Sequence, residues 1–121
     1  MPLPLTVAGK LQLPLDEGQA PAPLDFCLNM AFTEKVNEDR VYAGAIADDP
    51  VSLGTMTGGG ARLVLVKSHA GGCAVAINGG PTKFPVAPGG VFYWANPLGG
   101  FVNGLAITTT GPAKVTVLAV A

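Results

Sequence analysis

The sequence predicts an all-β protein: a β-sandwich of jelly-roll or meander type, preceded by an extended, proline-rich N-terminal arm. Three observations support this fold class. Short apolar runs recur at spacings of about 8 to 12 residues, Gly- and Pro-rich turns separate them, and the period of an amphipathic helix is essentially absent. In a chain of 121 residues with 17 Gly and 11 Pro, this pattern is typical of one small β-domain.

The first 23 residues contain five prolines and are predicted to form the arm, which leaves residues 24–121 for the sandwich. Proline has no amide hydrogen, so such a segment can neither continue a helix nor lie centrally in a sheet. Apolar alternation still favours an extended arm or edge strand, followed by a loop. We expect the arm to reach a neighbouring subunit through Pro2, Pro4, Leu11 and Leu13, and a fraying tail is the alternative.

Residues 24–36 alternate in polarity with period 2, with Phe26, Leu28, Met30 and Phe32 in phase, which predicts a strand facing the core. A short helix over the same window is the alternative. A turn and a second strand, at 41–47, are expected next, ended by a turn at Asp48-Asp49-Pro50.

From position 51 the rhythm is regular. A strand or bend at 51–56 and a turn at 57–60 come first, and strands are then predicted at 61–69, 73–77, 82–86, 91–95, 105–110 and 113–120. Asn78-Gly79 is a hairpin signal, because both residue types accept the positive φ of a tight turn. Gly-Gly pairs begin at Gly79, Gly89 and Gly99. Their spacing equals a strand plus a turn, so we interpret them as strand reversals.

Charge is sparse and unevenly distributed. Charged residues make up 12% of the chain, the net charge is −1, and all eight carboxylates lie between Asp16 and Asp49. Scattered Lys and Arg give no basic patch, so no nucleic-acid partner is expected. A monomer's surface usually carries more charge than this. We therefore predict a surface covered by other subunits, with a small, unusually neutral β-domain as the alternative.

Residues 84–113 carry no charge, but their prolines and Gly pairs exclude a regular spanning helix, so membrane insertion is not expected. The N-terminus lacks the pattern of a signal peptide, which makes synthesis in the cytoplasm the default. Cys27 and Cys73 have no CxxC neighbourhood and are interpreted as small buried residues, with a disulfide or a metal pair as alternatives.

Catalytic, cofactor-binding and metal-binding residues are not predicted, and the chain is not expected to be an enzyme. His69 is the single histidine, interpreted as facing a loop; Ser68 would point to the opposite face of a strand, and a pair with Cys73 lies in no known motif. The "TGGGAR" stretch lacks the helix that a phosphate loop needs. Asp39, Asp48 and Asp49 lack the spacing of a calcium loop.

The stretch "VFYWA" places Phe92, Tyr93 and Trp94 in series. On a strand, Phe92 and Trp94 share one face and Tyr93 takes the other. Core and interface packing is the expected use, so we include all three among the candidate interface residues. Sugar binding through an exposed Tyr93 or Trp94 is the alternative.

Residues 53–121 resemble small β-sandwich virion proteins of tailed bacteriophages. The shared features include an "LGT-T" element, an "A-LVLV" strand, a "V-ING" hairpin, a "PGGVF-W-NP" segment and a terminal "L-ITTTGPAKV-VL-V" pair. Such proteins occur in tail tips, baseplates and fibres and as capsid decoration. The resemblance implies a structural role and carries no catalytic residues.

The leading hypothesis is therefore a non-enzymatic component of a phage particle that is made in the host cytoplasm and becomes part of the virion. It would form a homo-oligomer, expected to be a trimer, and pack against other phage structural proteins. A place in the tail tip or baseplate is slightly favoured over capsid decoration. The alternative is a β-sandwich module that binds a carbohydrate or a host surface receptor.

Overall fold

The structure is a computed structural model that describes residues 3–13, 22–53, 56, 59–96 and 99–121. The chain divides into two compact units, Met1–Phe32 and Thr33–Ala121. The predicted boundary lay nine residues earlier, after position 23. The difference arises because the strand that covers residues 24–32 finds all of its pairing partners in the N-terminal segment.

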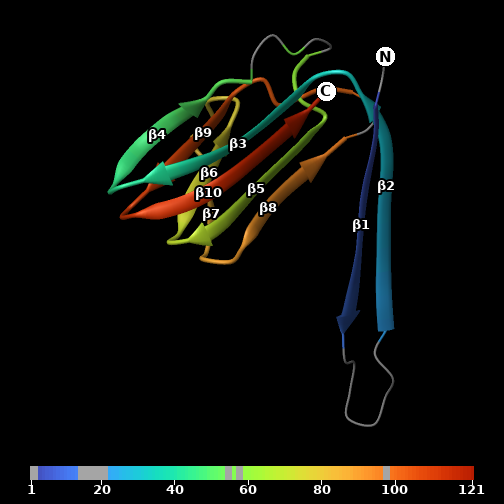
Figure 1. Cartoon of the computed structure of the whole chain (residues 1–121), viewed down its shortest axis with the longest axis horizontal. Coiled ribbons are helices and arrows are strands. Elements are labelled where there is room, and N and C mark those ends of the chain that lie inside the picture. The colour runs from blue at the N-terminus through green and yellow to red at the C-terminus, as the bar shows by residue number, and fades with distance from the viewer. Residues whose placement is uncertain (1–2, 14–21, 54–55, 57–58, 97–98) are drawn as a thin grey trace. The chain divides into compact units, whose positions relative to one another are not determined.

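The first unit is a two-stranded antiparallel ribbon of β1 (Leu3–Leu13) and β2 (Ala22–Phe32) (Figure 1). The expectation of extended structure holds for both segments. The assignment of residues 24–32 to the core of the sandwich does not, because this strand pairs with β1 along its whole length, from Leu3↔Phe32 to Leu13↔Ala22. Alternating apolar residues suit a ribbon as well as a core strand, so the pattern could not separate them. The loop predicted between them lies mostly outside the described residues.

The second unit is a β-sandwich of two four-stranded antiparallel sheets (Figure 1). We call β3-β10-β5-β8 the first sheet and β4-β9-β6-β7 the second sheet. The strands are β3 (Lys35–Tyr42), β4 (Ile46–Val51), β5 (Leu63–Ala70), β6 (Cys73–Ile77), β7 (Phe84–Val86), β8 (Val91–Ala95), β9 (Leu105–Thr109) and β10 (Ala113–Val120). Most connections cross from one sheet to the other, so sheet neighbours such as β3 and β10 are distant in sequence. This strand order is that of a jelly roll, which confirms the predicted fold class.

The core lies between the two sheets and is built from alternate residues of their strands. The fully buried side chains of this core include Val64 and Val66 of β5, Val75 of β6, Ile107 of β9, and Val115 and Val117 of β10. Branched side chains of this kind pack well on the pleated surface of a strand. From residue 61 onward the observed strands agree closely with the predicted ones.

The segment 35–51 differs from its prediction. One strand was expected at 41–47 and a turn at 48–50, whereas β3 ends at Tyr42 and β4 runs through Asp48, Asp49 and Pro50. The reversal falls between them, at residues 43–45. Two charged residues, Glu38 and Arg40, alternate with exposed positions of β3 and occupy its half-buried face. An apolar pattern could not reveal that face, because its members are not apolar.

The predicted turns fall where the Gly-rich stretches stand. Asn78 and Gly79 both have positive φ, 54° and 67°, as the hairpin signal requires. Gly89 also has positive φ, and the amide of Gly99 donates to the carbonyl of Asn96. The Gly-Gly pairs thus stand at strand reversals, as expected, although residues 97–98 lie outside the described chain.

Candidate functional site

One side of the sandwich is closed by aromatic side chains. The two terminal strands there are β7 of the second sheet and β8 of the first. The rings of Phe84 and Phe92 lie 5.4 Å apart, and those of Trp94 and Phe101 lie 5.7 Å apart. Phe92 and Trp94 pack against the core, as the shared face predicted for them requires. They are therefore half-buried packing residues of this edge.

The same side also exposes apolar surface. We define the edge patch as the four exposed hydrophobic residues Phe84, Val91, Tyr93 and Phe101, whose exposed fractions are 39%, 52%, 40% and 53%. Tyr93 faces away from Phe92 and Trp94, as predicted. The prediction missed Phe84 and Phe101, because a short strand and a loop bring them to β8 from elsewhere in the sequence. Sheet pairing is non-local, and no local pattern signals it.

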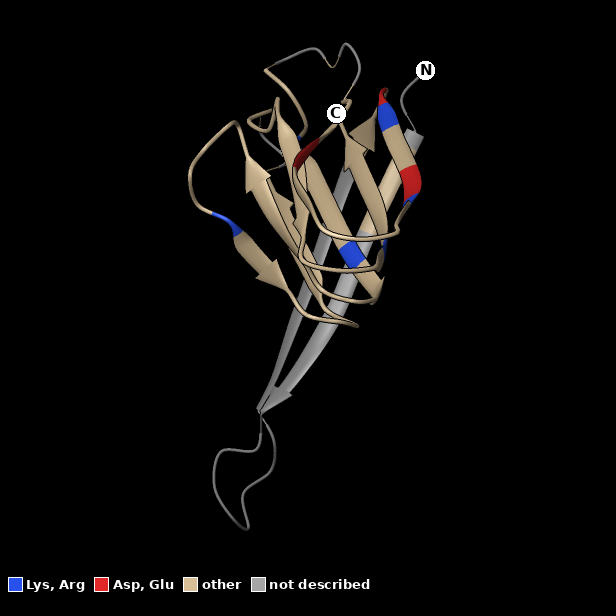
Figure 2. Ribbon diagram, turned by 90° about the vertical axis from the view of Figure 1, so that its left-hand side faces the viewer, with Lys and Arg blue, Asp and Glu red and all other residues tan. Residues whose placement is uncertain are grey.

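Charged groups are thinly spread over the described strands (Figure 2). Next to the edge patch stand Lys83, which precedes Phe84, and Lys67, which pairs across the strands with Val91. The patch itself is uncharged. Phe84 and Phe101 lie at the face of β8 that carries Phe92 and Trp94, whereas Val91 and Tyr93 lie on its other face, so the patch includes both faces of this strand.

Three of the four predicted residues of the N-terminal arm lie on β1. The register pairs Pro4 with Ala31, Leu11 with Leu24 and Leu13 with Ala22, and Pro4 is exposed. Pro2 lies outside the described residues. Their contact with a neighbouring subunit stays a prediction.

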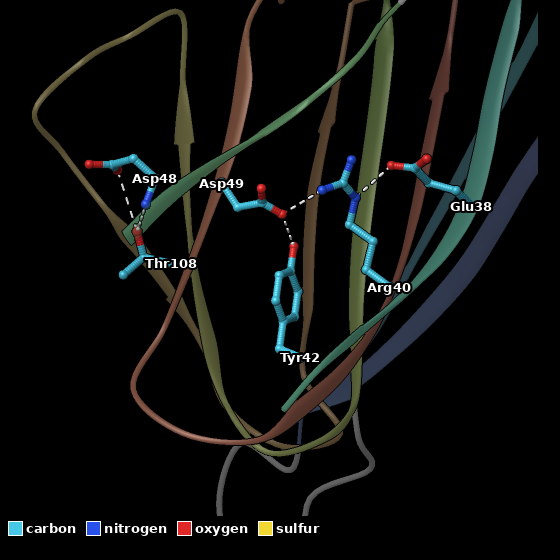
Figure 3. Close-up of polar contacts among 6 residues, drawn as sticks. All are labelled: Glu38, Arg40, Tyr42, Asp48, Asp49 and Thr108. Carbon is cyan, nitrogen blue, oxygen red and sulfur yellow. Dashed lines mark hydrogen bonds and ion pairs between the residues drawn. The ribbon is translucent and has the colours of Figure 1, made fainter. Parts of the chain in front are cut away.

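The opposite side of the sandwich is closed by a polar bridge between β3 and β4 (Figure 3). Arg40 lies between two carboxylates: its Nε donates to Glu38 Oε1 at 2.6 Å and its Nη1 to Asp49 Oδ2 at 2.5 Å. The hydroxyl of Tyr42 donates to the same Asp49 oxygen at 2.8 Å. Burial raises the pKa of Tyr42, and the bond to Asp49 adds to this effect. Asp49 therefore takes part in a structural bridge. The prediction that it belongs to a turn is wrong.

The other candidate carboxylates are also engaged. The backbone amide of Asp48 donates to Thr108 Oγ1 at 3.0 Å, and its carboxylate lies 3.4 Å from Lys83 Nζ. Asp39 Oδ1 accepts a hydrogen bond of 2.5 Å from Thr116 Oγ1. Among the described residues, no three His, Cys, Asp or Glu side chains gather as a metal site would require.

His69 lies on strand β5, within the strand predicted at 61–69, and its side chain belongs to an open polar pocket instead of facing a loop. The pocket has a volume of about 380 Å³ and is lined by Asp39, His69, Lys114 and Thr116. Thr116 gives its proton to Asp39, so the 2.7 Å contact with His69 Nε2 requires that this nitrogen donates. His69 therefore cannot act as a base toward Thr116 through this nitrogen. Its remaining nitrogen, Nδ1, can bond water or a polar ligand.

Ser68 and Cys73 do not take part in that pocket. Ser68 is fully buried while its neighbour His69 is exposed, which agrees with the opposite faces expected of them. Its hydroxyl donates to the carbonyl of Gly71. Cys73 is a free, buried thiol, and burial raises its pKa, which makes it a poor nucleophile. The interpretation of Cys73 as a small core residue is therefore confirmed.

Asn78 positions the aromatic edge, a role that the sequence did not suggest. Its Nδ2 donates to the carbonyl of Phe101 at 2.9 Å, and its Oδ1 accepts from the amides of Asn103 and Gly104 at 2.9 and 3.2 Å. The Asn78 side chain thereby fixes the backbone segment of Phe101, whose ring packs against Trp94. The Asn-Gly signal predicted the turn, but these long-range bonds have no local signature.

Comparisons with known proteins give one structural likeness. No protein-family model matches the chain, and no curated protein matches its sequence. Among solved structures, the cupin domain of Schizosaccharomyces pombe Cnp3 matches over 96% of this chain and 83% of its own, with 12% identity and a TM-score of 0.48. The jelly-roll assignment rests on the strand order itself. The described residues contain no helix long and apolar enough to span a membrane.

Proposed function

We propose that this chain is a non-enzymatic structural component of a tailed-bacteriophage particle, which self-assembles and packs against neighbouring virion proteins. The observation that carries the proposal is the ribbon of β1 and β2. A two-stranded ribbon is marginally stable in water when it stands by itself. Here β1 and β2 pair with each other over all eleven residues of each strand and with no other described strand. A partner surface would stabilise such a ribbon.

The edge patch supports the same proposal. It adds exposed aromatic and aliphatic surface on a second part of the chain, and the sparse charge opposes association little. Within the particle, we favour the tail tip or baseplate over capsid decoration and expect a trimer. The basis for these finer points is the resemblance of residues 53–121 to phage virion proteins. Jelly rolls serve many functions, so the fold alone does not select this one.

Two measurements test the proposal. Light scattering of the purified full chain over a range of concentrations should give the mass of an oligomer, and mass spectrometry of purified phage particles should find the chain in many copies. A chain that stays monomeric at high concentration and is absent from particles contradicts the proposal. The genes beside its own distinguish the locations, since capsid genes indicate decoration and tail genes indicate the tail.

A second candidate function is recognition of a carbohydrate or a host surface receptor. The observation that favours it is the exposed ring of Tyr93, because aromatic rings stack on sugar faces. Trp94, the other residue considered for this role, is half-buried against the core and Phe101. A glycan array on the full chain tests this function, with Tyr93→Ala as the variant that should abolish binding. A complete absence of glycan binding removes the carbohydrate candidate.

A further inference from the structure

The dipeptide Asn-Gly occurs twice in the chain, and the fold brings the two copies together. Asn78-Gly79 forms the turn after β6, and Asn103-Gly104 directly precedes β9. The backbone amide of Asn78 donates to the carbonyl of Gly104 at 2.8 Å. A Cβ added at Gly104 would lie 3.6 Å from the Cα of Asn78, so the two backbones lie next to each other.

Asn-Gly is the sequence at which an asparagine side chain is most easily deamidated, because glycine has no side chain to shield its nitrogen or to restrict its backbone. The glycine nitrogen loses its proton and bonds to Cγ of the asparagine, while the Cγ–Nδ2 bond breaks and ammonia leaves. Water then opens the resulting imide ring at either carbonyl group. The products are aspartate and isoaspartate, and isoaspartate has one extra methylene group in the backbone. The reaction therefore requires an amide nitrogen that is free to lose its proton and to turn toward Cγ.

The turn itself closes this route at Asn78. Asn78 and Gly79 have φ of 54° and 67°, and the amide of Gly80 donates to the carbonyl of Ile77 at 3.0 Å, which defines a type I′ turn. The first central residue of such a turn has a ψ of about 30°. This ψ directs the nitrogen of Gly79 away from the Cβ of Asn78, so it cannot reach Cγ while the turn is formed.

At Asn103 the restraint comes from the side chain of Asn78. Asn103 does not have positive φ and lies in no such turn. Its own amide and that of Gly104 both donate to Asn78 Oδ1, at 2.9 and 3.2 Å. The Gly104 nitrogen is the atom that would attack Asn103 Cγ. Its hydrogen bond to Oδ1 stabilises the protonated form and fixes its direction. The preceding residue is held as well, because the carbonyl of Val102 accepts from the amide of Ala61 at 2.7 Å.

We propose that Asn103 is a deamidation site that the side chain of Asn78 holds closed. Loss of the acceptor at Asn78 frees the Gly104 amide for attack. The residues on either side of the dipeptide, Val102 and Leu105, are buried, at 0% and 4% exposure. The extra methylene of isoaspartate would thus lengthen a short segment whose two ends are anchored in the core. This chemistry is independent of the proposed structural role.

Two full-length variants at Asn78 isolate the acceptor. Asn78→Gly accepts the φ of 54° but removes the oxygen that binds the Gly104 amide. Asn78→Asp keeps an acceptor oxygen, and aspartate tolerates positive φ. Both variants lose the hydrogen bond to the carbonyl of Phe101, so they differ in the acceptor. Gly71→Ala is a further control, since it strains a turn at the other end of β6 and tests the effect of lower stability alone.

The readout is peptide mapping by mass spectrometry after incubation in mildly alkaline buffer, with aspartate and isoaspartate measured at both positions. Urea denaturation first establishes that each variant is folded under these conditions. Folded wild type should deamidate at Asn78 and Asn103 at least about tenfold more slowly than the urea-unfolded chain. Asn78→Gly should accelerate the reaction at Asn103 at least about tenfold over folded wild type, a factor that one or two hydrogen bonds supply. Asn78→Asp and Gly71→Ala should stay near the wild-type rate.

A second substitution tests the attacking atom. Gly104→Ala, added to Asn78→Gly, should suppress the reaction at Asn103, because a methyl group hinders the nitrogen. The nearest atom to a Cβ at that position is at ordinary contact distance, so the fold has room for it. In the wild type, hydrogen exchange followed by NMR should show a protected Gly104 amide, and this measurement needs no variant.

Each opposite result overturns the inference. These results are a wild-type rate at Asn103 in Asn78→Gly, an equal acceleration in Asn78→Asp, and an equal acceleration in Gly71→Ala, which would assign the effect to stability alone. A reaction that persists after Gly104→Ala, or a wild-type Gly104 amide that exchanges as fast as in the unfolded chain, has the same consequence.

Discussion

Arg40 of β3 and Asp49 of β4 join the two sheets at one side of the sandwich, with 2.5 Å between Nη1 and Oδ2 (Figure 3). Both side chains are largely shielded, at 22% and 25% exposure. The hydroxyl of Tyr42 converges on the same oxygen. The two sides of the sandwich are thus closed by opposite chemistry, a hydrogen-bonded ion pair at β3/β4 and aromatic rings at β7/β8. Charged residues on the half-buried face of the terminal strand β3 also discourage other strands from pairing there.

Replacing Asp49 by Asn should lower the free energy of unfolding by about 1 to 3 kcal/mol, because the half-buried Arg40 and the buried Tyr42 lose a charged acceptor. Urea denaturation measures this change. The matched control is Asp48→Asn, since Asp48 forms a more exposed pair with Lys83 at 3.4 Å. Exposed pairs contribute little, so the control should differ from the wild type by less than about 0.5 kcal/mol. Equal losses in the free energy of unfolding of Asp49→Asn and Asp48→Asn would show that the bridge stabilises the fold no more than the exposed pair does.

Alkaline pH should destabilise the sandwich through Cys73 and Tyr42. Burial raises the pKa of both groups above their values in the unfolded chain, which are about 8.5 and 10. At a pH below the unfolded pKa values, both groups are protonated in the folded and in the unfolded chain, so the difference in pKa has no effect on stability. As the pH rises through them toward the folded values, the unfolded chain releases its protons first, and the stability of the fold decreases.

Urea denaturation between pH 7 and 11 measures this dependence. Cys73→Ala should flatten the loss that begins near pH 8.5, and Tyr42→Phe should flatten the later loss that begins near pH 10. Each substitution also has a constant effect on stability, so the comparison uses the slope with pH and not the absolute value. A Cys73→Ala variant with the wild-type slope up to about pH 9.5 contradicts the assignment.

Much of the fold could be predicted from the sequence, because β5 to β10 are separated by Gly- and Pro-rich turns and alternate regularly. The failures have physical reasons. The bounds of β3 were predicted wrongly because Glu38 and Arg40 occupy its half-buried face. β2 was assigned to the core because an apolar alternation does not name its partner strand. Local patterns define strands, whereas pairing between distant strands decides which layer each one joins.

The candidate site was predicted in part for the same reason. Phe92, Tyr93 and Trp94 are adjacent, so strand geometry alone predicted that Phe92 and Trp94 share one face and that Tyr93 takes the other. It did not predict which of the two faces packs against the core. Phe84 and Phe101 reach the edge patch only through the neighbouring terminal strand and a loop fixed by Asn78. The hydrogen bond between His69 and Thr116 spans 47 residues and was equally invisible.

Asn78 can be tested by two substitutions that separate its roles. Asn78→Gly removes the hydrogen bonds to Phe101, Asn103 and Gly104 but still accepts a φ of 54°. Asn78→Ala removes the same hydrogen bonds and also disfavours this φ. The first should lower stability by about 1 to 3 kcal/mol, and the second by about 1 kcal/mol more.

The single Trp94 provides a local readout, since Phe101 packs on it. Its fluorescence in the folded Asn78→Gly variant should shift to longer wavelength as the loop loosens and water reaches the ring. Asn37→Ala, on strand β3, serves as the control and should leave the emission unchanged. Unshifted emission in Asn78→Gly would mean that Phe101 holds its place without the side chain of Asn78.

Gly71 joins two turns at one end of the sandwich and should not tolerate a side chain. Its φ is 67°, and a Cβ added there would lie 2.1 Å from the carbonyl oxygen of Pro112, which precedes β10. Gly71→Ala should therefore lower the free energy of unfolding by about 2 to 4 kcal/mol, through the left-handed backbone and the clash together. Gly44→Ala is the control, because no atom lies within 4 Å of a Cβ at that turn. Its effect should stay within about 0.5 kcal/mol. The turn of Gly71 links β5 to β6, and the turn of Pro112 precedes β10. A loss of stability of similar size in both variants would mean that these two turns are not in close contact.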